Sequence, residues 1–198
     1  EKIADWLIDK MQKKDGSFYT RYFRKENKFE VNGNKWSKQS GSFLAKMSIG
    51  LFNLYSILND GKYKNAVRKI CDFALKFEEK SGRFVTDSND NSTFVHAHCY
   101  TIEGLLSAAI MLNDNNYMES AINPLNWILR KQSPNGSFPT YFTNNTFVNV
   151  ESPDISSQVI RLYLLARNIG NIGKINNINL DLGIKRIFDY QCMNNERE

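Results

Sequence analysis

The chain has 198 residues, of which 41% are hydrophobic, 24% charged and 13% aromatic, and its formal net charge is +5. This length suits one domain with a real core, and the aromatic content excludes an intrinsically disordered chain. No apolar stretch approaches the roughly 20 residues that span a bilayer, so we expect no membrane partner. The three cysteines are widely spaced, which argues against a disulfide framework or a zinc knuckle and favours a reducing, cytoplasmic location.

A short pattern occurs three times, each time at the end of an apolar helical stretch. It reads Gln or Glu, three residues, Gly, one residue, Phe, and it begins at Gln12, Glu78 and Gln132. A second pattern, Leu-Asn-Asp-x-x-Tyr, begins at Leu58 and returns at Leu112. The offset from 58 to 112 equals the offset from 78 to 132, so the two patterns repeat with the same spacing. The agreement indicates an internal repeat of supersecondary units.

The same displacement superposes Gly50 on Gly104, and both glycines fall in the middle of apolar segments predicted to be helical. A helix without a side chain at such a point can approach its neighbour closely. We therefore expect a close helix–helix contact at both positions.

Each unit contains two predicted helices. Apolar residues at three- and four-residue spacing predict the first helix, and a segment that is apolar around most of its circumference predicts a more buried second helix. The first helices are expected at 2–13, 64–79, 118–131 and 182–192, and the second at 43–58, 99–112 and 155–167. Longer polar loops join first to second helices at 17–42, 83–98 and 138–154. We expect these loops at one end of the array, which in repeat proteins is usually the binding face.

The predicted fold class is therefore all-α, with repeated antiparallel helical hairpins that form a partial or open α/α toroid and no substantial sheet. Three hairpins and part of a fourth fill residues 1–198 as one helical repeat domain. A closed ring of six such hairpins needs roughly 300 residues or more, so we expect a piece of a larger toroid or an open array. The outermost helices carry apolar residues that nothing covers, which predicts further residues or a homodimer at these edges: Ile3, Trp6, Leu7, Met11, Ile184, Ile187 and Phe188.

The helix that ends in Gln-x-x-x-Gly-x-Phe resembles the QW motif of the terpenoid cyclase and protein prenyltransferase toroids, where Gln and an aromatic residue tie helix ends together. Phe18, Phe84 and Phe138 stand where tryptophan is usual in that motif, and neither the Asp-rich motif of the cyclases nor the zinc ligands of the transferases are present. The hairpin pattern is also similar to the six-hairpin sugar enzymes, which include uronyl hydrolases, polysaccharide lyases and sugar epimerases. This resemblance implies an α/α-toroid fold and action on a carbohydrate or another polar small molecule.

Residues that can carry chemistry gather at the start of the second helix in the second and third units. Histidine titrates near neutrality, tyrosine and carboxylates can share in proton transfer, and arginine can hold an anionic group with two hydrogen bonds. We predict an acid–base site of hydrolase, lyase or epimerase type, with the catalytic candidates His96, His98, Tyr100, Glu103 and Asp154. The substrate-binding candidates are Gln158 and Arg161, aligned with Tyr100 and Glu103 or one residue out of step, and the loop aromatics Trp36 and Tyr141.

Other interpretations stay open at this point. His98 and Tyr100 can be hydrogen-bonded residues at a helix start, with Glu103 paired to Arg161, in a non-catalytic binding or scaffold module. His-x-His beside Cys99 offers zinc-ligand types, but no second closely spaced ligand pair follows, so no metal site is assigned. The segment 21–25 interleaves cations with aromatics, yet one such cluster without a recognised fold predicts no nucleic-acid partner. Phosphate-binding loops are absent, so the sequence indicates no cofactor.

Overall fold

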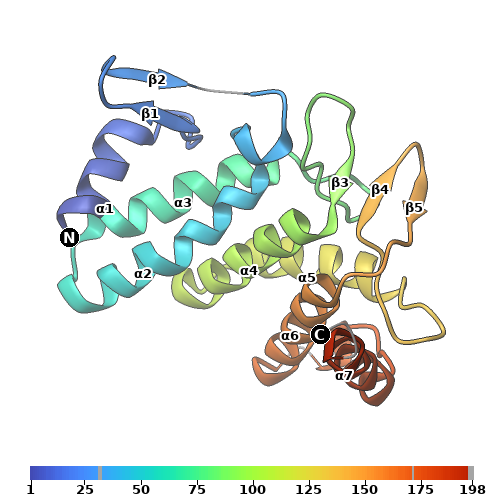
Figure 1. Ribbon diagram of the computed structural model, residues 1–198. Coiled ribbons are helices and arrows are strands. Elements are labelled where there is room, and N and C mark those ends of the chain that lie inside the picture. Colours follow the sequence, from blue (N-terminus) through green and yellow to red (C-terminus); the bar gives the residue numbers. More distant parts are fainter. Residues whose placement is uncertain (31–32, 171, 196–198) are drawn as a thin grey trace.

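A computed structural model describes residues 1–30, 33–170 and 172–195. In this part of the chain the α-helices are α1 (Lys2–Trp6), α2 (Met47–Leu58), α3 (Gly61–Leu75), α4 (Val95–Leu112), α5 (Asn115–Leu129), α6 (Pro153–Asn168) and α7 (Leu180–Asn195). A π-helical turn, Leu7–Met11, continues α1, and a 3₁₀ helix, Ser42–Lys46, leads into α2. Helices α2 and α3, α4 and α5, and α6 and α7 pack in pairs (Figure 1). The prediction of an all-α array of helical hairpins is confirmed.

Two kinds of helix alternate along the chain. We call α2, α4 and α6 the inner helices, because α2 packs on α4 and α4 on α6, and α1, α3, α5 and α7 the outer helices. Outer helix α3 contacts both α2 and α4, and α5 contacts both α4 and α6. Helix α4 is buried along most of its length, as predicted for a second helix, whereas α2 buries only Ser48 and Leu51. The burial predicted for α2 is thus wrong, since among the described residues this helix has an inner neighbour on one side only.

The Gly of the first repeat pattern forms the turn that ends an outer helix. Gly16, Gly82 and Gly136 have φ values of +90°, +85° and +90°, a left-handed conformation that suits glycine. A side-chain carbon at these positions would also meet a backbone carbonyl oxygen of the next outer helix, at 1.9, 3.0 and 2.6 Å respectively. The repeated glycine is therefore required both by backbone conformation and by close approach of the turn to the neighbouring helix.

The second repeat pattern joins an inner helix to the next outer helix. Asn59 and Asn113 end α2 and α4 in the left-handed conformation, which asparagine tolerates better than most residues. The next residue in each case, Asp60 or Asp114, is already the N-cap of the following helix and accepts hydrogen bonds from its first backbone amides. Each joint therefore consists of two residues, a C-cap of the inner helix followed directly by the N-cap of the outer helix.

The tyrosine of the second pattern connects neighbouring outer helices. Tyr63 donates a hydrogen bond to the Asp5 carboxylate at 2.6 Å, and Tyr117 donates one to Asp72 at 2.5 Å. The accepting aspartate lies seven residues before the repeat Gln in the first outer helix (12 minus 5) but six before the repeat Glu in α3 (78 minus 72). The π-helical turn Leu7–Met11 takes up this additional residue, so the same contact forms in both places.

The loops that follow the outer helices contain short strands, which the sequence did not predict. Strands β1 (Arg21–Phe23) and β2 (Lys28–Glu30) form one hairpin, and β3 (Thr93–Phe94), β4 (Tyr141–Thr143) and β5 (Thr146–Val148) form a small antiparallel sheet. The pairing of β3 with β4 links the second loop to the third (Figure 1). Gln39 likewise donates to Asp87 at 2.7 Å between the first and second loops. The loops therefore gather at one end of the array, as predicted.

The outermost helices show four of the seven expected apolar residues exposed, whereas Leu7 and Ile187 are half-buried against the core. Ile3 is 78% exposed and Phe188 58% exposed, whereas Met11 is buried against the core. Among the described residues, no helix is both long and apolar enough to cross a membrane.

Candidate functional site

His98 lies inside the protein, apart from the other predicted site residues. Its Nδ1 accepts a hydrogen bond from the Phe84 amide at 3.3 Å, and its Nε2 is 3.1 Å from the Pro124 carbonyl oxygen, to which it donates. The ring is fully buried, and desolvation lowers the pKa of His98 to about 4, so the imidazole is neutral at physiological pH. The structure does not bring this predicted catalytic residue to the surface where a substrate could reach it.

The hydrogen bond that the Phe84 amide donates to His98 has an equivalent in the first and third units, where the acceptor is a serine. The amide of the pattern phenylalanine donates to Ser40 Oγ in the first unit, at 3.1 Å, and to Ser156 Oγ in the third, at 3.3 Å. His98 and Ser156 therefore occupy equivalent positions in the second and third units. Counting two residues on from each sets Tyr100 opposite Gln158 and excludes the alignment that differs by one residue.

Glu103 is the centre of an ionic cluster that joins α4 and α6 to the 3₁₀ helix leading into α2. Its Oε2 lies 2.6 Å from an Arg161 guanidinium nitrogen, 3.2 Å from Lys46 Nζ, and accepts a hydrogen bond from Gln158 at 3.1 Å. Burial opposes ionisation of Glu103, but the hydrogen bonds and positive charges of Arg161 and Lys46 outweigh it and hold the pKa of this carboxyl below its ordinary value. Glu103 is therefore a carboxylate at neutral pH, suited to fix Arg161 and Gln158 and not to donate a proton.

His96 and Asp154 form an accessible pair beside this cluster. His96 Nδ1 is 3.2 Å from Asp154 Oδ2, and the side chains are 32% and 58% exposed. Asp154 is in the first turn of α6. The hydrogen bond from Ser152, and to a smaller extent the one from His96, lowers the pKa of Asp154. A carboxylate on one imidazole nitrogen orients the ring and leaves the other nitrogen to exchange a proton with a ligand.

Tyr100 connects the histidine pair to the ionic cluster. Its ring meets the His96 ring edge-on with centroids 4.5 Å apart, and Lys46 Nζ lies 3.8 Å from the centre of the Tyr100 ring. A cation at that distance from an aromatic face is attracted by the ring electrons. Contacts therefore run without a break from Asp154 through His96, Tyr100 and Lys46 to Glu103. We call this set, with Arg161 and Gln158, the inner-helix cluster.

Lys46 is the member of this cluster that the sequence reasoning missed. It lies at the end of the 3₁₀ helix before α2, four positions before Gly50, just as Tyr100 lies four positions before Gly104. The displacement that superposes Gly50 on Gly104 therefore also superposes Lys46 on Tyr100. Applying the repeat to the candidate site, and not only to the helices, would have identified it.

The predicted binding aromatics Trp36 and Tyr141 lie together with a third ring. Trp36 stacks on Phe94 with centroids 5.4 Å apart, and Phe94 contacts Tyr141 at 4.5 Å. Tyr141 also donates a hydrogen bond to Asp90 at 3.1 Å. All three rings are half-buried and come from three successive loops. They form an aromatic row at the loop end, close to His96 along the chain.

Two alternative chemistries gain no support from the described residues. Cys99 is fully buried, and desolvation raises the pKa of its thiol, which leaves it protonated and out of reach. Within residues 1–30, 33–170 and 172–195, no three side chains of His, Cys, Asp or Glu come together as metal ligands.

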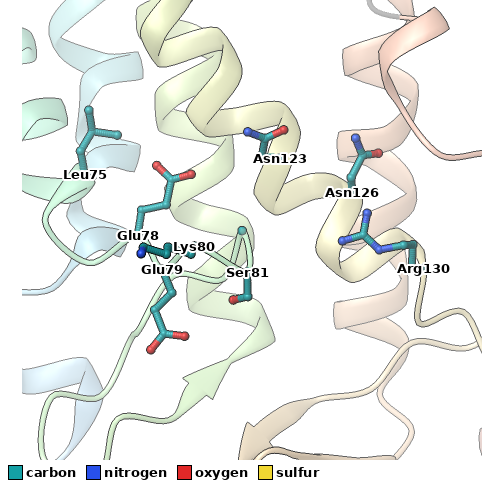
Figure 2. A pocket seen from close by; sticks show the side chains of 9 residues that line it. Leu75, Glu78, Glu79, Lys80, Ser81, Asn123, Asn126 and Arg130 are labelled. Atoms are coloured by element: carbon teal, nitrogen blue, oxygen red, sulfur yellow. The ribbon is translucent and has the colours of Figure 1, made fainter.

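A polar cavity of about 660 Å³ lies elsewhere, between the turn after α3 and the side of α5 (Figure 2). Glu78 and Ser81 line it on the turn, and Asn123, Asn126 and Arg130 line it on α5. Burial raises the pKa of Glu78, which occupies the place of the repeat glutamine. None of the predicted site residues lines this cavity.

Comparisons with known proteins identify the fold. The chain is similar to a cellobiose 2-epimerase from Bacillus thermoamylovorans, with 14% identity, a TM-score of 0.74, and coverage of 96% of this chain and 52% of that one. It is also similar to an α-amylase from Clostridium perfringens, with 19% identity, a TM-score of 0.57, and coverage of 92% and 50%. A third match is an inactive variant of an α-1,6-mannanase from Salegentibacter in complex with α-1,6-mannotetrose, with 12% identity, a TM-score of 0.57, and coverage of 87% and 65%.

No protein-family model matches the sequence, and neither does any curated protein. The chain spans about half the length of the first two matched structures. At these identities the likeness concerns the fold alone. The chain therefore has the fold of part of an α/α toroid, an architecture that it shares with carbohydrate-active enzymes.

Proposed function

We propose that the inner-helix cluster is part of the saccharide site of a carbohydrate-active enzyme of the hydrolase, lyase or epimerase type. The observation that carries this proposal is the unbroken series of contacts across α4, α6 and the 3₁₀ helix before α2, which ends in the partly exposed His96–Asp154 pair. Structural ion pairs alone do not need an accessible histidine at their end. An oriented imidazole that solvent reaches is a proton-transfer group available to a ligand.

The groups of the cluster take different roles in this proposal. His96 gives and takes the proton, and Asp154 holds its ring in one orientation. Arg161, 49% exposed, and Gln158 present donors to hydroxyl or carboxylate groups, while the ionised Glu103 keeps them in place. The aromatic row of Trp36, Phe94 and Tyr141 lies on the adjoining loops, where ring faces can stack on a pyranose. His98 is a buried residue of α4 that hydrogen-bonds to Phe84 and Pro124, and it takes no part in the chemistry.

The test measures binding and turnover separately. Cellobiose and α-1,6-mannotetraose are titrated into the chain by isothermal calorimetry, and proton NMR in deuterated buffer follows changes at the anomeric and C2 positions. We expect His96→Asn and Asp154→Asn to lower turnover at least a hundredfold, because the proton-transfer group or its orientation is lost. A matched control is Asp181→Asn, which removes an acidic residue from the first turn of α7 as Asp154→Asn does for α6. Equal losses for both aspartate variants would contradict the proposal.

A non-catalytic binding module is the second candidate. The contacts of Glu103 favour this candidate. Its Oε2 already contacts three protein donors, as expected for the centre of a structural ion-pair network. This candidate predicts saccharide binding that weakens in Arg161→Ala, together with no turnover of any sugar in the panel. Binding without chemistry, unchanged by His96→Asn, would decide for the module.

A further inference from the structure

The contact between α4 and the start of α2 shows how two inner helices meet in this fold. A side-chain carbon at Gly104 would lie 2.2 Å from the backbone carbonyl of Ala45, so the two backbones touch at the glycine. Ser48 Oγ, less than one turn further along, donates a hydrogen bond to the Gly104 carbonyl at 2.8 Å. The prediction of close approach at Gly104 is therefore confirmed, and the element that approaches is the 3₁₀ helix Ser42–Lys46 with the first turn of α2.

The repeat places a second glycine at the same point of α2, but there the contact is absent from the described part of the chain. Gly50 is exposed, and nothing lies within 4 Å of the position that its side-chain carbon would take. The prediction of close approach at this glycine is thus wrong for the described residues. An exposed glycine inside a helix lowers helix stability, and no close packing contact offsets this loss. Its presence at the repeat position points to a contact that the described residues do not supply.

The surface around Gly50 has the character of an unfilled helix–helix interface. A groove of about 370 Å³ runs between α1 and α2, with Gly50 in its wall. Its other lining is chiefly apolar and includes Ile3, Leu7, Leu51 and Leu54. Ile3 is 78% exposed and belongs to this apolar lining, and a contiguous apolar patch at the surface is typical of an interaction site. We call this feature the Gly50 groove.

We propose that the Gly50 groove seats the start of a further inner helix of the same repeat, in the way that Ser42–Ser48 is seated on Gly104. The occupant carries a small residue whose backbone rests on Gly50 and a hydroxyl residue three positions later that donates to the Gly50 carbonyl. Its apolar side covers Leu51, Leu54 and Ile3. The inference extends an interface that is already present between α2 and α4, and it does not depend on the proposed saccharide chemistry.

A second copy of this chain fits the groove less well than a further repeat unit. One outer helix lies between successive inner helices, as α3 lies between α2 and α4. A second copy could offer the start of its α6, but its α7, which packs on α6, would come with it. Two outer helices, α7 of the copy and α1 of this chain, would then compete for the place that the repeat gives to one.

The experiment uses a labelled peptide with the sequence of residues 41–58, which contains the element that sits on Gly104. Fluorescence anisotropy measures its binding to the 198-residue chain and to Gly50→Leu, which fills the groove. The control is Gly61→Leu, since Gly61 also has nothing within 4 Å of its side-chain position among the described residues but begins α3. We expect saturable binding to the chain and to Gly61→Leu, and at least a tenfold weaker affinity for Gly50→Leu or for a peptide with Ala45→Leu.

Circular dichroism first establishes that Gly50→Leu is folded, with a melting temperature no lower than that of the unaltered chain. Failure of the peptide to bind at millimolar concentration, or equal binding to Gly50→Leu, overturns the proposal. Light scattering supplies a separate outcome: a dimer that dissociates in Gly50→Leu but not in Gly61→Leu makes a second copy the occupant and also overturns it.

Discussion

The turns that end the outer helices and the cluster on the inner helices are both built from repeat positions, but they use them in opposite ways. At the turns the repeat keeps its residues: Gly16, Gly82 and Gly136 share one backbone conformation and one contact. In the cluster, the repeat position that holds Tyr100 in the second unit holds Gln158 in the third. The comparison shows that the repeat retains what the backbone needs and diversifies the side chains of the candidate site. The two regions should therefore differ in how much stability a substitution removes.

Alanine at the turn glycines should give the largest losses of stability. The strain of a left-handed backbone adds to the clash of the new side-chain carbon with the next outer helix. We expect Gly16→Ala to lower the free energy of unfolding by about 3–5 kcal/mol and Gly82→Ala by about 2 kcal/mol, since a side-chain carbon would lie 1.9 and 3.0 Å from a carbonyl oxygen. Gly170→Ala is the control, with φ +87° and nothing within 4 Å among the described residues, and should cost about 1–2 kcal/mol. Urea denaturation measures all three. Equal losses would show that conformation alone, and not contact with the next helix, requires the glycine.

Acid should destabilise the protein through His98. The pKa of His98 is about 4 when folded and near 6.5 when unfolded, so below pH 6.5 the unfolded chain takes up a proton that the folded chain does not. Stability from this group is complete above pH 6.5 and falls as pH drops towards 4, by about 3 kcal/mol in total.

Replacing His98 by the residue of the other repeats isolates this contribution. His98→Ser is expected to be less stable at pH 7, since the bond to Pro124 is lost, but to show a smaller decline between pH 6.5 and 4. Thermal melts across this pH range for both proteins give the difference. Parallel curves would mean that His98 does not carry the acid sensitivity.

Removing the charge of Glu103 should have a moderate effect. Glu103→Gln leaves Arg161 and Lys46 without their shared anion, and because both cations are partly exposed we expect a loss of about 1 kcal/mol. Glu119→Gln, an exposed change on α5, is the matched control and should be neutral within error. Urea denaturation at low and high salt provides the check, and the loss should shrink as salt screens the pairs.

His96→Ala should change stability least, by under about 0.5 kcal/mol, because its side chain is partly exposed and its bond to Asp154 is at the surface. A drop as large as that of His98→Ser would contradict the separation between the two histidines. It would also mean that His96, like the turn glycines, is required for stability.

The sequence predicted the helices well because each carries a clear apolar period. Their boundaries differed by up to four residues, as at α4, which begins at Val95 and not at 99. The short strands were missed, since two- and three-residue segments have no period to detect. The π-helical turn could be recognised only after the Asp5 contact was known.

The candidate site was predicted in part. Every candidate on α4 and α6 except His98 belongs to the inner-helix cluster, and Trp36 and Tyr141 lie in the aromatic row. His98 could not be separated from His96 by sequence, because the two residues point to different sides of the first turn of α4 and the sequence does not show which side is buried. The hydrogen bond of the Phe84 amide, whose equivalents reach serines in the other units, distinguishes the two histidines. The repeat itself contained the clue to Lys46.

The two-residue joints after α2 and α4 also determine where the chain can change in length. Because Asn59 ends one helix and Asp60 already caps the next, the joint has no spare residue to absorb a change of angle. The connections at the opposite end are long loops whose strands pair with one another. The joints therefore fix the angle between successive helices, and changes in chain length can be absorbed only at the loop end. Insertions should be tolerated in the exposed turn 24–27 between β1 and β2 and should destabilise the fold at 59–60, as urea denaturation would show.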